Sequence, residues 1–436
     1  SLKSGYKGLI DTDNQFDKLI KNFKEYKDKD IELEKKELKT LRDYQVTGVK
    51  WLYNIYKTGF GGILADEMGL GKSIQLIYLI KLIIKEKPKA KILIVSPTSL
   101  IYNWQKEFDK FAKELNYEVI ASNKEKRKEL LEGKNKTNIL ITTYGLVRND
   151  FEMYEKMNFE LIAIDEAQNI KNPIAGITKS VKKLNANIKL ALTGTPLENS
   201  VMELWSIFDF IMPGYLANQK KFQGLYNVKN MEEESVKALD RLNKQIKYFI
   251  LRRKKKDVVT DLPDKIENNI YIDLNEHQKK IYAAEVQKTK ESMEEMIKTE
   301  GFEGARFKIL QLLTKLRQIC IDPSLVFDNY KGESSKIEEL LKIIEEEKAN
   351  GHKILLFSSY KKALDLINQK LTNNKISSYY ISGEVSAKKR MELVENFNKD
   401  DTDVFMITIK AGGTGLNLTS ATVVIHLDLW WNPQVE

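Results

Sequence analysis

Eight consecutive residues have side chains and backbone suited to binding phosphate: Asp66, Glu67, Met68, Gly69, Leu70, Gly71, Lys72 and Ser73. An apolar run precedes them and an apolar helix-like segment follows. A loop at a helix N-terminus presents backbone N–H groups to an anion, and glycines let the backbone approach it closely. In such a loop the lysine reaches the β- and γ-phosphates and the hydroxyl binds Mg²⁺. We expect all eight residues, called the phosphate loop from here on, to line a nucleotide site, although the general pattern has glycine where Asp66 stands.

Two carboxylates follow a second apolar run. Residues 161–164 are apolar and lead into Asp165 and Glu166. In a parallel sheet this order places both carboxylates at the carboxyl edge, beside the phosphate loop. We expect Asp165 to hold Mg²⁺ through water and Glu166 to orient and deprotonate an attacking water, with Lys72 as the third catalytic residue. An acidic strand end that caps the next helix is the alternative for either carboxylate taken alone.

The elements that must position these residues follow from an alternation of short β-branched runs with longer amphipathic segments. This alternation predicts parallel sheets covered by helices on both faces. The fold class is therefore α/β, with two parallel-sheet domains and helical insertions. We expect a helical lead-in over 1–37, a first domain over 38–213, insertions and a linker over 214–335, and a second domain over 336–436. The expected strands are 62–65, 92–96, 138–142, 161–165, 189–193, 353–358, 377–381, 404–408 and 422–427.

The composition excludes several classes of protein. With 42% hydrophobic and 31% charged residues among 436, the chain has the composition of a globular protein of about two or three domains. One cysteine excludes an intramolecular disulfide, and three scattered histidines exclude a histidine metal cluster. No apolar run approaches the ~20 residues of a membrane span, and the N-terminus has no signal-peptide core, so we expect a cytoplasmic protein, associated with the nucleoid if the source is bacterial. The net charge of +9 favours an anionic partner such as nucleic acid or nucleotide.

Several motifs in order resemble those of one family. The loop at 66–73, the Asp-Glu-Ala-Gln box at 165–168 and the segment 192–199 resemble Swi/Snf-type ATPases, the chromatin-remodeller-like branch of superfamily 2 helicases. The resemblance covers about residues 40–436, and aspartate at the first loop position is usual in that family. It implies two RecA-like domains and an ATP- and Mg²⁺-dependent translocase that moves on double-stranded DNA and remodels or displaces DNA-bound protein. It also matches Gln45 to the glutamine that reads adenine, whose amide can both donate and accept.

The resemblance also implies a DNA track. In the first domain the track includes Thr98, Thr142 and Thr143, because hydroxyl groups suit contacts with phosphates, which position a duplex without reading its sequence. In the second domain it includes Lys410, in a glycine-rich loop, and Trp431, just before an Asn-Pro turn. Packing against the other domain is the alternative for Trp431, and packing in the core is the expectation for Trp104. The residues implied to couple nucleotide and DNA are Thr193, Gly194, Thr195, Gly413 and Gly415.

The basic run at 252–256 and the family's arginine block both bear on the interpretation of this sequence. The run 252–256 resembles the family's linker between the two domains, whereas its composition alone indicates a basic patch or a targeting run.

The family's block with two arginines that reach the γ-phosphate follows the Asn-Pro turn, and the sequence ends at Glu436 before it. One alternative is therefore a polypeptide that binds ATP and DNA with little turnover. A separate alternative is an RNA-directed superfamily 2 helicase, which the 192–199 block and the long helical inserts disfavour. We expect a monomer without membrane association, and the high ratio of lysine to arginine indicates a bacterial source.

Overall fold

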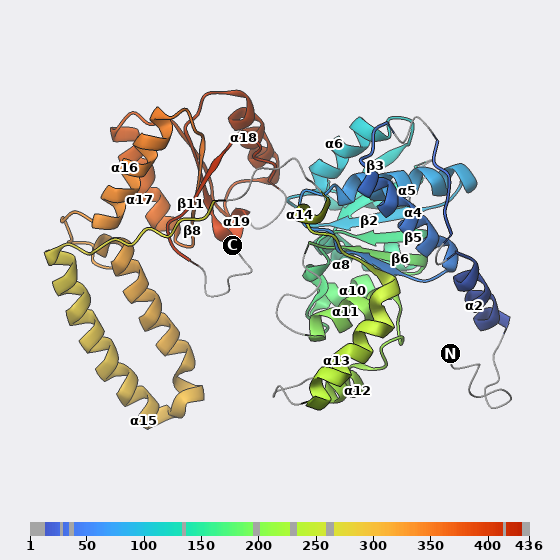
Figure 1. The fold of residues 1–436 in the computed structure, drawn as a ribbon, viewed down its shortest axis with the longest axis horizontal. Coiled ribbons are helices and arrows are strands. Elements are labelled where there is room, and N and C mark those ends of the chain that lie inside the picture. Colours follow the sequence, from blue (N-terminus) through green and yellow to red (C-terminus); the bar gives the residue numbers. More distant parts are fainter. Residues whose placement is uncertain are drawn as a thin grey trace. The chain divides into compact units, whose positions relative to one another are not determined.

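The structure of the protein is a computed structural model (Figure 1). It describes residues 14–26, 29–34, 39–132, 137–194, 201–226, 233–258, 266–412 and 416–429, with only the backbone described at 14–16, 233–236 and 410. The chain divides into two compact units, Ser1–Pro263 and Asp264–Glu436. The helical insertion predicted over 214–335 is thus shared between the units, and the boundaries drawn from the sequence stay a proposal.

The first unit is built on a seven-stranded parallel sheet in the order β3-β4-β2-β5-β6-β1-β7. The five strands predicted for this half are present, which confirms the α/β fold class. Two further strands were not predicted, because one is short and only half-buried and the other has two residues, so neither produces a clear apolar run. The strands are β1 (Gly62–Leu64), β2 (Ile92–Ser96), β3 (Tyr117–Val119), β4 (Ile139–Thr143), β5 (Phe159–Ile164), β6 (Ala186–Leu192) and β7 (Ile250–Leu251).

Helices lie on both faces of this sheet (Figure 1), because parallel neighbours are joined by crossovers that lay helices across the sheet. Short 3₁₀ turns, η1 (Ala167–Ile170) and η2 (Lys247–Phe249), follow β5 and precede β7. The helices are α2 (Asn14–Tyr26), α4 (Asp43–Thr58), α5 (Lys72–Glu86), α6 (Ile101–Phe111), α7 (Lys124–Glu132), α8 (Tyr144–Asn149), α9 (Phe151–Glu155), α10 (Gly176–Lys183), α11 (Val201–Ile211), α12 (Gln219–Tyr226), α13 (Glu233–Ile246) and α14 (Lys255–Val258).

The core of the first unit lies between the sheet and these helices. All residues of β1, β2 and β4 are buried, as expected for strands that are covered on both faces. The spacing of apolar residues in α6 explains why this segment forms a helix against the sheet. Ile101, Trp104 and Phe108 recur at helical spacing, and all three are buried against the sheet while the opposite face carries charges. The prediction that Trp104 packs in the core is therefore confirmed.

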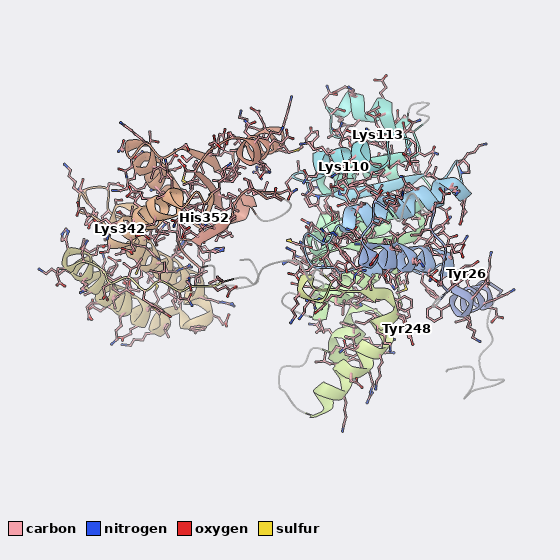
Figure 2. The ribbon with its side chains drawn as sticks, turned by 45° about the horizontal axis from the view of Figure 1, so that its top comes forward. Tyr26, Lys110, Lys113, Tyr248, Lys342 and His352 are labelled. Carbon is pink, nitrogen blue, oxygen red and sulfur yellow. The ribbon has the colours of Figure 1, made fainter. Side chains whose placement is uncertain are left out.

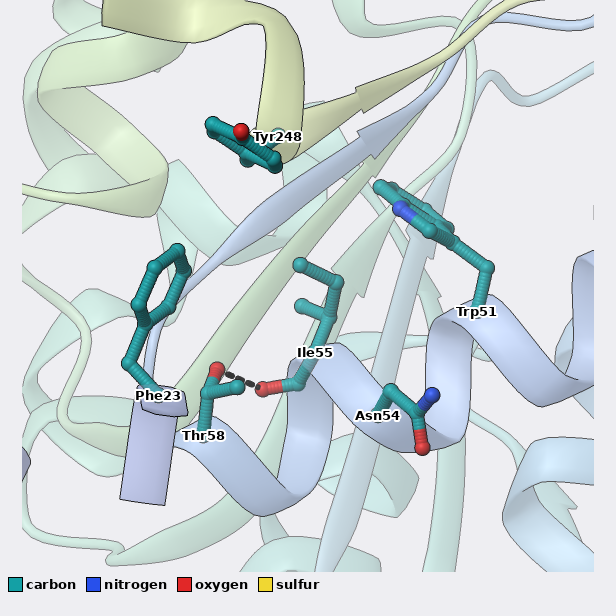
Figure 3. Close-up of a pocket in the computed structure, with 6 residues that line it drawn as sticks. All are labelled: Phe23, Trp51, Asn54, Ile55, Thr58 and Tyr248. Carbon is teal, nitrogen blue, oxygen red and sulfur yellow. Dashed lines mark hydrogen bonds between the residues drawn. The ribbon is translucent and has the colours of Figure 1, made fainter. Parts of the chain in front are cut away.

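The lead-in helix α2 packs against α4. The ring of Phe23 makes edge-on contacts with Phe60 and Tyr248. Beside it lies a small hollow (Figure 3), in which Thr58 donates its hydroxyl to the carbonyl of Ile55 within α4 at 2.6 Å. None of the residues that line the hollow belongs to the phosphate loop: they are Phe23, Trp51, Asn54, Ile55, Thr58 and Tyr248.

The second unit contains a four-stranded parallel sheet in the order β11-β8-β10-β9. Its strands are β8 (Ile354–Ser358), β9 (Ser378–Ile381), β10 (Val404–Thr408) and β11 (Val423–His426), so all four strands predicted here are present. Strand β10 is central and completely buried. The helices around the sheet are η3 (Pro323–Leu325), α16 (Ser335–Ala349), α17 (Lys361–Asn373), α18 (Ala387–Lys399) and α19 (Ile409–Gly412).

A long helical hairpin, α15 (Glu276–Ile321), precedes this sheet in the chain. Asn275 caps its start, because the side-chain oxygen accepts the N–H of Gln278 at 2.8 Å. The helix is interrupted at Gly301, whose φ of 72° and ψ of 169° are not helical. Figure 1 shows the two arms side by side, and Lys315 on one arm pairs with Glu285 on the other at 2.5 Å. The sequence predicted helix here, but a glycine inside a helical pattern does not by itself distinguish a reversal of the chain from a tolerated helix residue.

Charged side chains surround both units (Figure 2). Lys110 and Lys113 extend from the end of α6, and Lys342 and His352 lie at the surface of the second unit. Within the ranges that the structure describes, no helix is long and apolar enough to cross a membrane. The same ranges contain no group of three His, Cys, Asp or Glu side chains that could hold a metal ion.

Candidate active site

The phosphate loop joins the end of β1 to the start of α5. Gly69 has a φ of 84° and Gly71 a φ of 74°, both in the left-handed region that favours glycine. A Cβ atom at Gly71 would also lie 2.5 Å from Nε2 of Gln45. Residues 67–69 are exposed, and Lys72 is the first residue of α5. The loop therefore presents its backbone and a helix N-terminus to solvent, which is the arrangement that phosphate binding requires.

Lys72 lies among carboxylates. Its Nζ donates to the backbone carbonyl of Asp66 at 2.8 Å. Burial lowers the pKa of Lys72, while the nearby charges of Glu166, Asp165 and Asp66 act in the opposite direction. An anionic ligand beside the ammonium would favour its charged form further. The structure thus brings Lys72 close to both of the carboxylates that the sequence singled out.

Asp165 directly follows β5, and its buried carboxylate is held from two sides. Trp104 donates its Nε1–H to Oδ2 at 2.9 Å, and the backbone N–H of Glu166 donates to Oδ1 at 2.9 Å. Burial, together with the charge of Glu166, raises the pKa of Asp165 to about 6, while Trp104 and Lys72 oppose this shift. A divalent cation would favour the ionised carboxylate. Sequence reasoning missed that Trp104 also orients Asp165.

Glu166 has a strained backbone. Its φ of 50° and ψ of 60° lie in the left-handed region, which residues with side chains rarely adopt and which recurs at active sites. Hydrogen bonds hold the turn in this conformation. The side chain of Gln168 donates to Oε2 of Glu166 at 2.8 Å, and the side chain of Asn169 donates to its carbonyl at 2.8 Å. The turn after β5 therefore fixes the direction of the Glu166 carboxylate.

Gln168 connects Glu166 to the end of β6. Its Oε1 accepts the hydroxyl of Thr193 at 3.0 Å, and the N–H of Thr193 donates to the carbonyl of Leu64 at 3.1 Å. The three side chains Glu166, Gln168 and Thr193 thus form a continuous hydrogen-bonded chain from the carboxylate pair to β6. Sequence reasoning missed Gln168, although it lies inside the box at 165–168.

Gly194 lies against the phosphate loop. A Cβ atom at this position would lie 3.1 Å from Cγ of Met68 and 3.9 Å from Nζ of Lys72. The segment predicted to sense the nucleotide therefore contacts the loop predicted to bind it. Some predicted residues lie outside the part of the chain that the structure describes: Thr195, Gly413, Gly415, Trp431 and the side chain of Lys410.

Gln45 lies on α4 beside the same loop. Its Nε2 donates to the carbonyl of Leu70 at 3.3 Å, and its Oε1 accepts the backbone N–H of Arg42 at 3.0 Å. The amide therefore contacts the phosphate loop and also closes the first turn of α4. This position beside the loop is compatible with the predicted contact to adenine, which stays a prediction.

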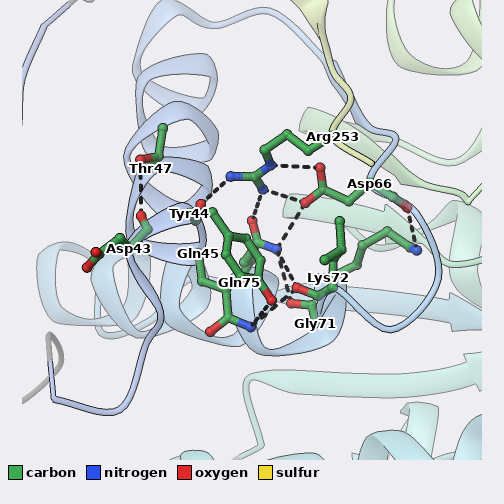
Figure 4. Close-up of polar contacts among 10 residues, drawn as sticks. Asp43, Tyr44, Gln45, Thr47, Asp66, Gly71, Lys72, Gln75 and Arg253 are labelled. Atoms are coloured by element: carbon green, nitrogen blue, oxygen red, sulfur yellow. Dashed lines mark hydrogen bonds and ion pairs between the residues drawn. The ribbon is translucent and has the colours of Figure 1, made fainter. Parts of the chain in front are cut away.

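Asp66 is engaged by Arg253 (Figure 4). Nε of Arg253 donates to one carboxylate oxygen at 2.9 Å and Nη2 donates to the other. Gln75 donates to Asp66 at 3.2 Å and accepts from Arg253 at 2.8 Å. The carboxylate is fully buried. We therefore assign the Asp66 side chain a structural role and leave it out of the proposed nucleotide contacts.

Gly48 on α4 has no side chain, and this makes room for the cluster of Asp66, Gln75 and Arg253. A Cβ atom there would lie 1.7 Å from Oε1 of Gln75 and 2.7 Å from Nη2 of Arg253. Arg253 also donates to the backbone carbonyl of Tyr44, which lies in the first turn of α4. The cluster of Asp66, Gln75 and Arg253 thus ties the phosphate loop to α4 and to the segment that follows β7.

The residues predicted for the DNA track lie in different surroundings. Thr98 is exposed in the loop between β2 and α6, and the hydroxyl of Thr143 caps α8 by accepting a backbone N–H. Thr142 is fully buried. Its hydroxyl donates to the carbonyl of Ile120 at 3.3 Å and accepts from the hydroxyl of Tyr154 at 3.1 Å. Since this hydroxyl is not at the surface, we leave Thr142 out of the proposed DNA contacts.

The donors near the loop fit the chemistry of Mg²⁺. This cation prefers oxygen ligands and is usually held by one or two carboxylates together with phosphate oxygens of the substrate. Ser73, half-buried in the first turn of α5, offers a hydroxyl, and Asp165 offers a carboxylate whose raised pKa a cation would lower. Ser73 and Asp165 are therefore the residues that would hold the metal.

Two arginines of the second unit are engaged in packing. Arg317 donates to the carbonyl of Leu429 and lies 3.9 Å from the carboxylate of Asp428. Arg390 donates to backbone carbonyls at 2.9–3.3 Å, those of Val385, Ser382 and Ala411. Both side chains therefore hold segments of their own unit in place.

Known proteins match the chain over nearly its whole length. Residues 44–325 match the family described as SNF2-related domain, and residues 335–436 match the helicase conserved C-terminal domain. An uncharacterized ATP-dependent helicase of Mycoplasma pneumoniae is 38% identical, over 98% of this chain and 41% of that protein. The putative ATP-dependent helicase/translocase YwqA of Bacillus subtilis is 35% identical, over 91% of this chain and 44% of that protein.

Other relatives are eukaryotic and archaeal. The ISWI chromatin-remodeling complex ATPase ISW1 of Saccharomyces cerevisiae is 31% identical, over 91% of this chain and 36% of that protein. A solved structure, the Sulfolobus solfataricus SWI2/SNF2 ATPase core in complex with dsDNA, is 36% identical, with a TM-score of 0.49 over 90% of this chain and 83% of that chain. The chain thus spans between 36% and 44% of the length of these curated relatives. Since the first family match alone covers well over half of its residues, the chain belongs to the SNF2-related family of helicase-like ATPases.

Proposed function

We propose that the chain binds ATP with Mg²⁺ at the phosphate loop and hydrolyses it. The observation that carries this proposal is the convergence of Lys72, Asp165 and Glu166, in which burial and neighbouring charges shift the pKa values of Lys72 and Asp165. The loop follows β1 and the carboxylates follow β5, and only β6 separates these two strands in the sheet. Ligands of parallel sheets bind at this carboxyl edge. The bacterial relatives are named ATP-dependent helicases.

Each catalytic side chain has a separate task in the proposed reaction. The ammonium of Lys72 and the backbone N–H groups of the loop bind the β- and γ-phosphates. Ser73 and Asp165 would hold Mg²⁺, whose positive charge would neutralise the charge that develops on the transferring phosphoryl group. The carboxylate of Glu166 orients the attacking water and accepts its proton. The hydrogen bond from Gln168 keeps that carboxylate directed into the site.

The chain of hydrogen bonds from Glu166 through Gln168 to Thr193 supports a second part of the proposal. A change at the γ-phosphate that moves Glu166 would alter the bond between Gln168 and Thr193, at the end of β6. Gly194, which follows, lies against Met68 of the phosphate loop. We therefore propose that Thr193 and Gly194 transmit the state of the nucleotide to the rest of the protein.

We also propose that the polymer on which the protein acts is double-stranded DNA. One relative is named a helicase/translocase and another a chromatin-remodeling ATPase, and the net charge of this chain is +9. Thr98 and Thr143 lie at the carboxyl ends of the neighbouring strands β2 and β4. The exposed hydroxyl of Thr98 offers a contact to phosphates rather than to bases. Thr143 is buried and its hydroxyl caps α8, so its side chain, like that of Thr142, is left out of the proposed DNA contacts.

ATP turnover of the chain is expected to rise when duplex DNA is added. Because the proposed contacts are to phosphates, duplexes of unrelated sequence should stimulate turnover alike, and affinity should fall steeply with salt, with a log–log slope of about −0.9 for each phosphate contact. Phosphate release measured across a series of salt concentrations, with duplex DNA and with duplex RNA, checks both expectations. Stronger stimulation by RNA would contradict the proposed polymer.

Phosphate release, together with calorimetric titration of ATP and of duplex DNA, decides the alternative drawn from the sequence. A chain that binds ATP and duplex DNA with little turnover would show saturable binding of both ligands and a low rate of phosphate release that DNA does not change. That result would contradict the proposed hydrolysis while leaving the nucleotide site in place.

A further inference from the structure

The segment that follows β7 runs alongside the phosphate loop. Strand β7 pairs in parallel with β1, at the edge of the sheet. The pairing continues beyond both strands, because the N–H of Ala65 donates to the carbonyl of Leu251 at 2.7 Å and the N–H of Glu67 donates to the carbonyl of Arg253 at 3.0 Å. Ala65 and Glu67, at the start of the phosphate loop, are therefore held by backbone hydrogen bonds to Leu251 and Arg253, which lie far away in the sequence.

Because of this pairing, Lys255 lies beside the middle of the phosphate loop. Its backbone N–H donates to the carboxylate of Glu67 at 2.7 Å. Its side chain lies over Gly69, where a Cβ atom would be 3.1 Å from Cε and 3.3 Å from Nζ of Lys255. The charge of Lys255 also lowers the pKa of Lys72, in addition to the larger effect of burial. The two ammonium groups are therefore near neighbours on the same loop.

Two like charges side by side repel each other, and burial of one of them adds to the cost. An anion with several charges, bound between them, would turn this repulsion into attraction. The long side chain of Lys255 lies along the surface of the phosphate loop. Among the residues that the structure describes, its ammonium has no ion-pair partner within 4.0 Å. By contrast, the carboxylate of Glu67 is directed to the backbone of Lys255.

We propose that Lys255 is a second phosphate-binding cation of the nucleotide site, supplied by the segment after β7 and not by the phosphate loop itself. The ligand is a nucleoside di- or triphosphate, whose phosphates would lie between the ammonium groups of Lys255 and Lys72, above the backbone of Gly69. The inference rests on the proposed function, because it assumes that the loop binds the phosphates of ATP.

Two residues of the run 252–256, Arg253 and Lys255, thus have different roles. Arg253 is directed inward, to Asp66 and Gln75, whereas Lys255, two residues later, lies on the loop surface. Lys254 and Lys256, which flank Lys255, are exposed. One short segment thus anchors the loop with its arginine and adds a charge to the binding surface with its lysine. Because the chain continues from this segment toward the second unit, bound nucleotide would restrain the start of that connection.

The test is the affinity of Lys255→Met for ATP and ADP, measured by isothermal titration calorimetry in the presence of Mg²⁺. Loss of one charge-assisted phosphate contact should weaken binding of both nucleotides by about tenfold. Lys255→Arg keeps the charge and should bind nearly as well as the unchanged chain. Lys256→Met removes the same charge from an exposed neighbour and serves as the matched control, with affinity unchanged. The backbone bond to Glu67 is available in all these variants, and their thermal unfolding midpoints report whether the fold is preserved.

Two results would overturn the inference. Affinity of Lys255→Met equal to that of Lys256→Met would exclude a phosphate contact by Lys255. Equal losses in Lys255→Met and Lys255→Arg would assign the effect to packing over Gly69 and not to charge. Lys72→Ala separates this failure from failure of the proposed function: if Lys72→Ala loses ATP affinity while Lys255→Met does not, the nucleotide site stands and only Lys255 is removed from it.

Discussion

Replacing Glu166 with glutamine is expected to lower DNA-stimulated ATP turnover by about 10²–10⁴-fold, which is the usual contribution of a general base. Glutamine has the same shape, keeps an oxygen that can accept the hydrogen bond from Gln168, and meets the same backbone strain at a φ of 50°. It cannot take a proton from the attacking water. ATP affinity should therefore stay close to that of the unchanged chain. Phosphate release with saturating duplex DNA, together with calorimetric titration of ATP, measures the two quantities.

Glu152→Gln is the matched control for this change. Glu152 is an exposed carboxylate on α9 of the same unit, so its amide variant should retain full turnover. Turnover of Glu166→Gln equal to that of the control would remove Glu166 as the base. A parallel loss of ATP affinity and turnover would instead assign Glu166 to nucleotide binding.

Arg253→Met is expected to lower the free energy of unfolding of the first unit by about 3–5 kcal/mol. The change leaves the carboxylate of Asp66 fully buried without its ionic partner, and breaking a buried ion pair from one side has a cost of this size. It also removes the hydrogen bonds from Arg253 to Gln75 and to the carbonyl of Tyr44. Urea unfolding followed by tryptophan fluorescence, in a chain in which Trp430 and Trp431 of the second unit are replaced by phenylalanine, reports on this unit, because Trp104 and Trp205 are buried in its core.

Two further variants make this prediction specific to the buried pair. Arg252→Met removes the same charge from the exposed neighbouring residue and should change stability by no more than about 0.5 kcal/mol. Combining Arg253→Met with Asp66→Asn removes both charges and should recover part of the lost stability, since the two effects are coupled. A loss in Arg253→Met no larger than that in Arg252→Met would show that the pair does not stabilise the loop.

The parts of the fold that were predictable from the sequence are those that depend on local patterns. Strands such as β2 and β5 are covered on both faces, so their sequences are almost continuously apolar and stand out from the amphipathic helices around them. Strand β7 has two residues, and its place in the sheet depends on pairing with β1. The reversal at Gly301 depends on the packing of the two arms of α15, since one glycine is compatible with a helix or with a turn.

The site shows the same division between local and long-range information. Lys72, Asp165 and Glu166 belong to short motifs whose order along parallel strands already implied that they would meet at one edge of the sheet. The contacts that orient them join residues far apart in the chain, such as Trp104 with Asp165 and Arg253 with Asp66, at separations of 61 and 187 residues. Position in a motif also did not show which hydroxyl groups are accessible. Thr142 is fully buried, with its hydroxyl engaged by two neighbours, whereas Thr98 is exposed.

Calorimetric titration of ATP into the unchanged chain and into Lys72→Ala, with and without Mg²⁺, tests the nucleotide site most directly. We expect one ATP to bind to each unchanged chain, with an affinity that falls when Mg²⁺ is removed, because the proposed role of Ser73 and Asp165 is to hold the metal. Lys72→Ala should bind ATP at least about tenfold more weakly, since it lacks the ammonium on which the charges of both carboxylates act. Equal affinity in the two proteins, or affinity that does not depend on Mg²⁺, would contradict an ATP site built from Lys72, Ser73 and Asp165.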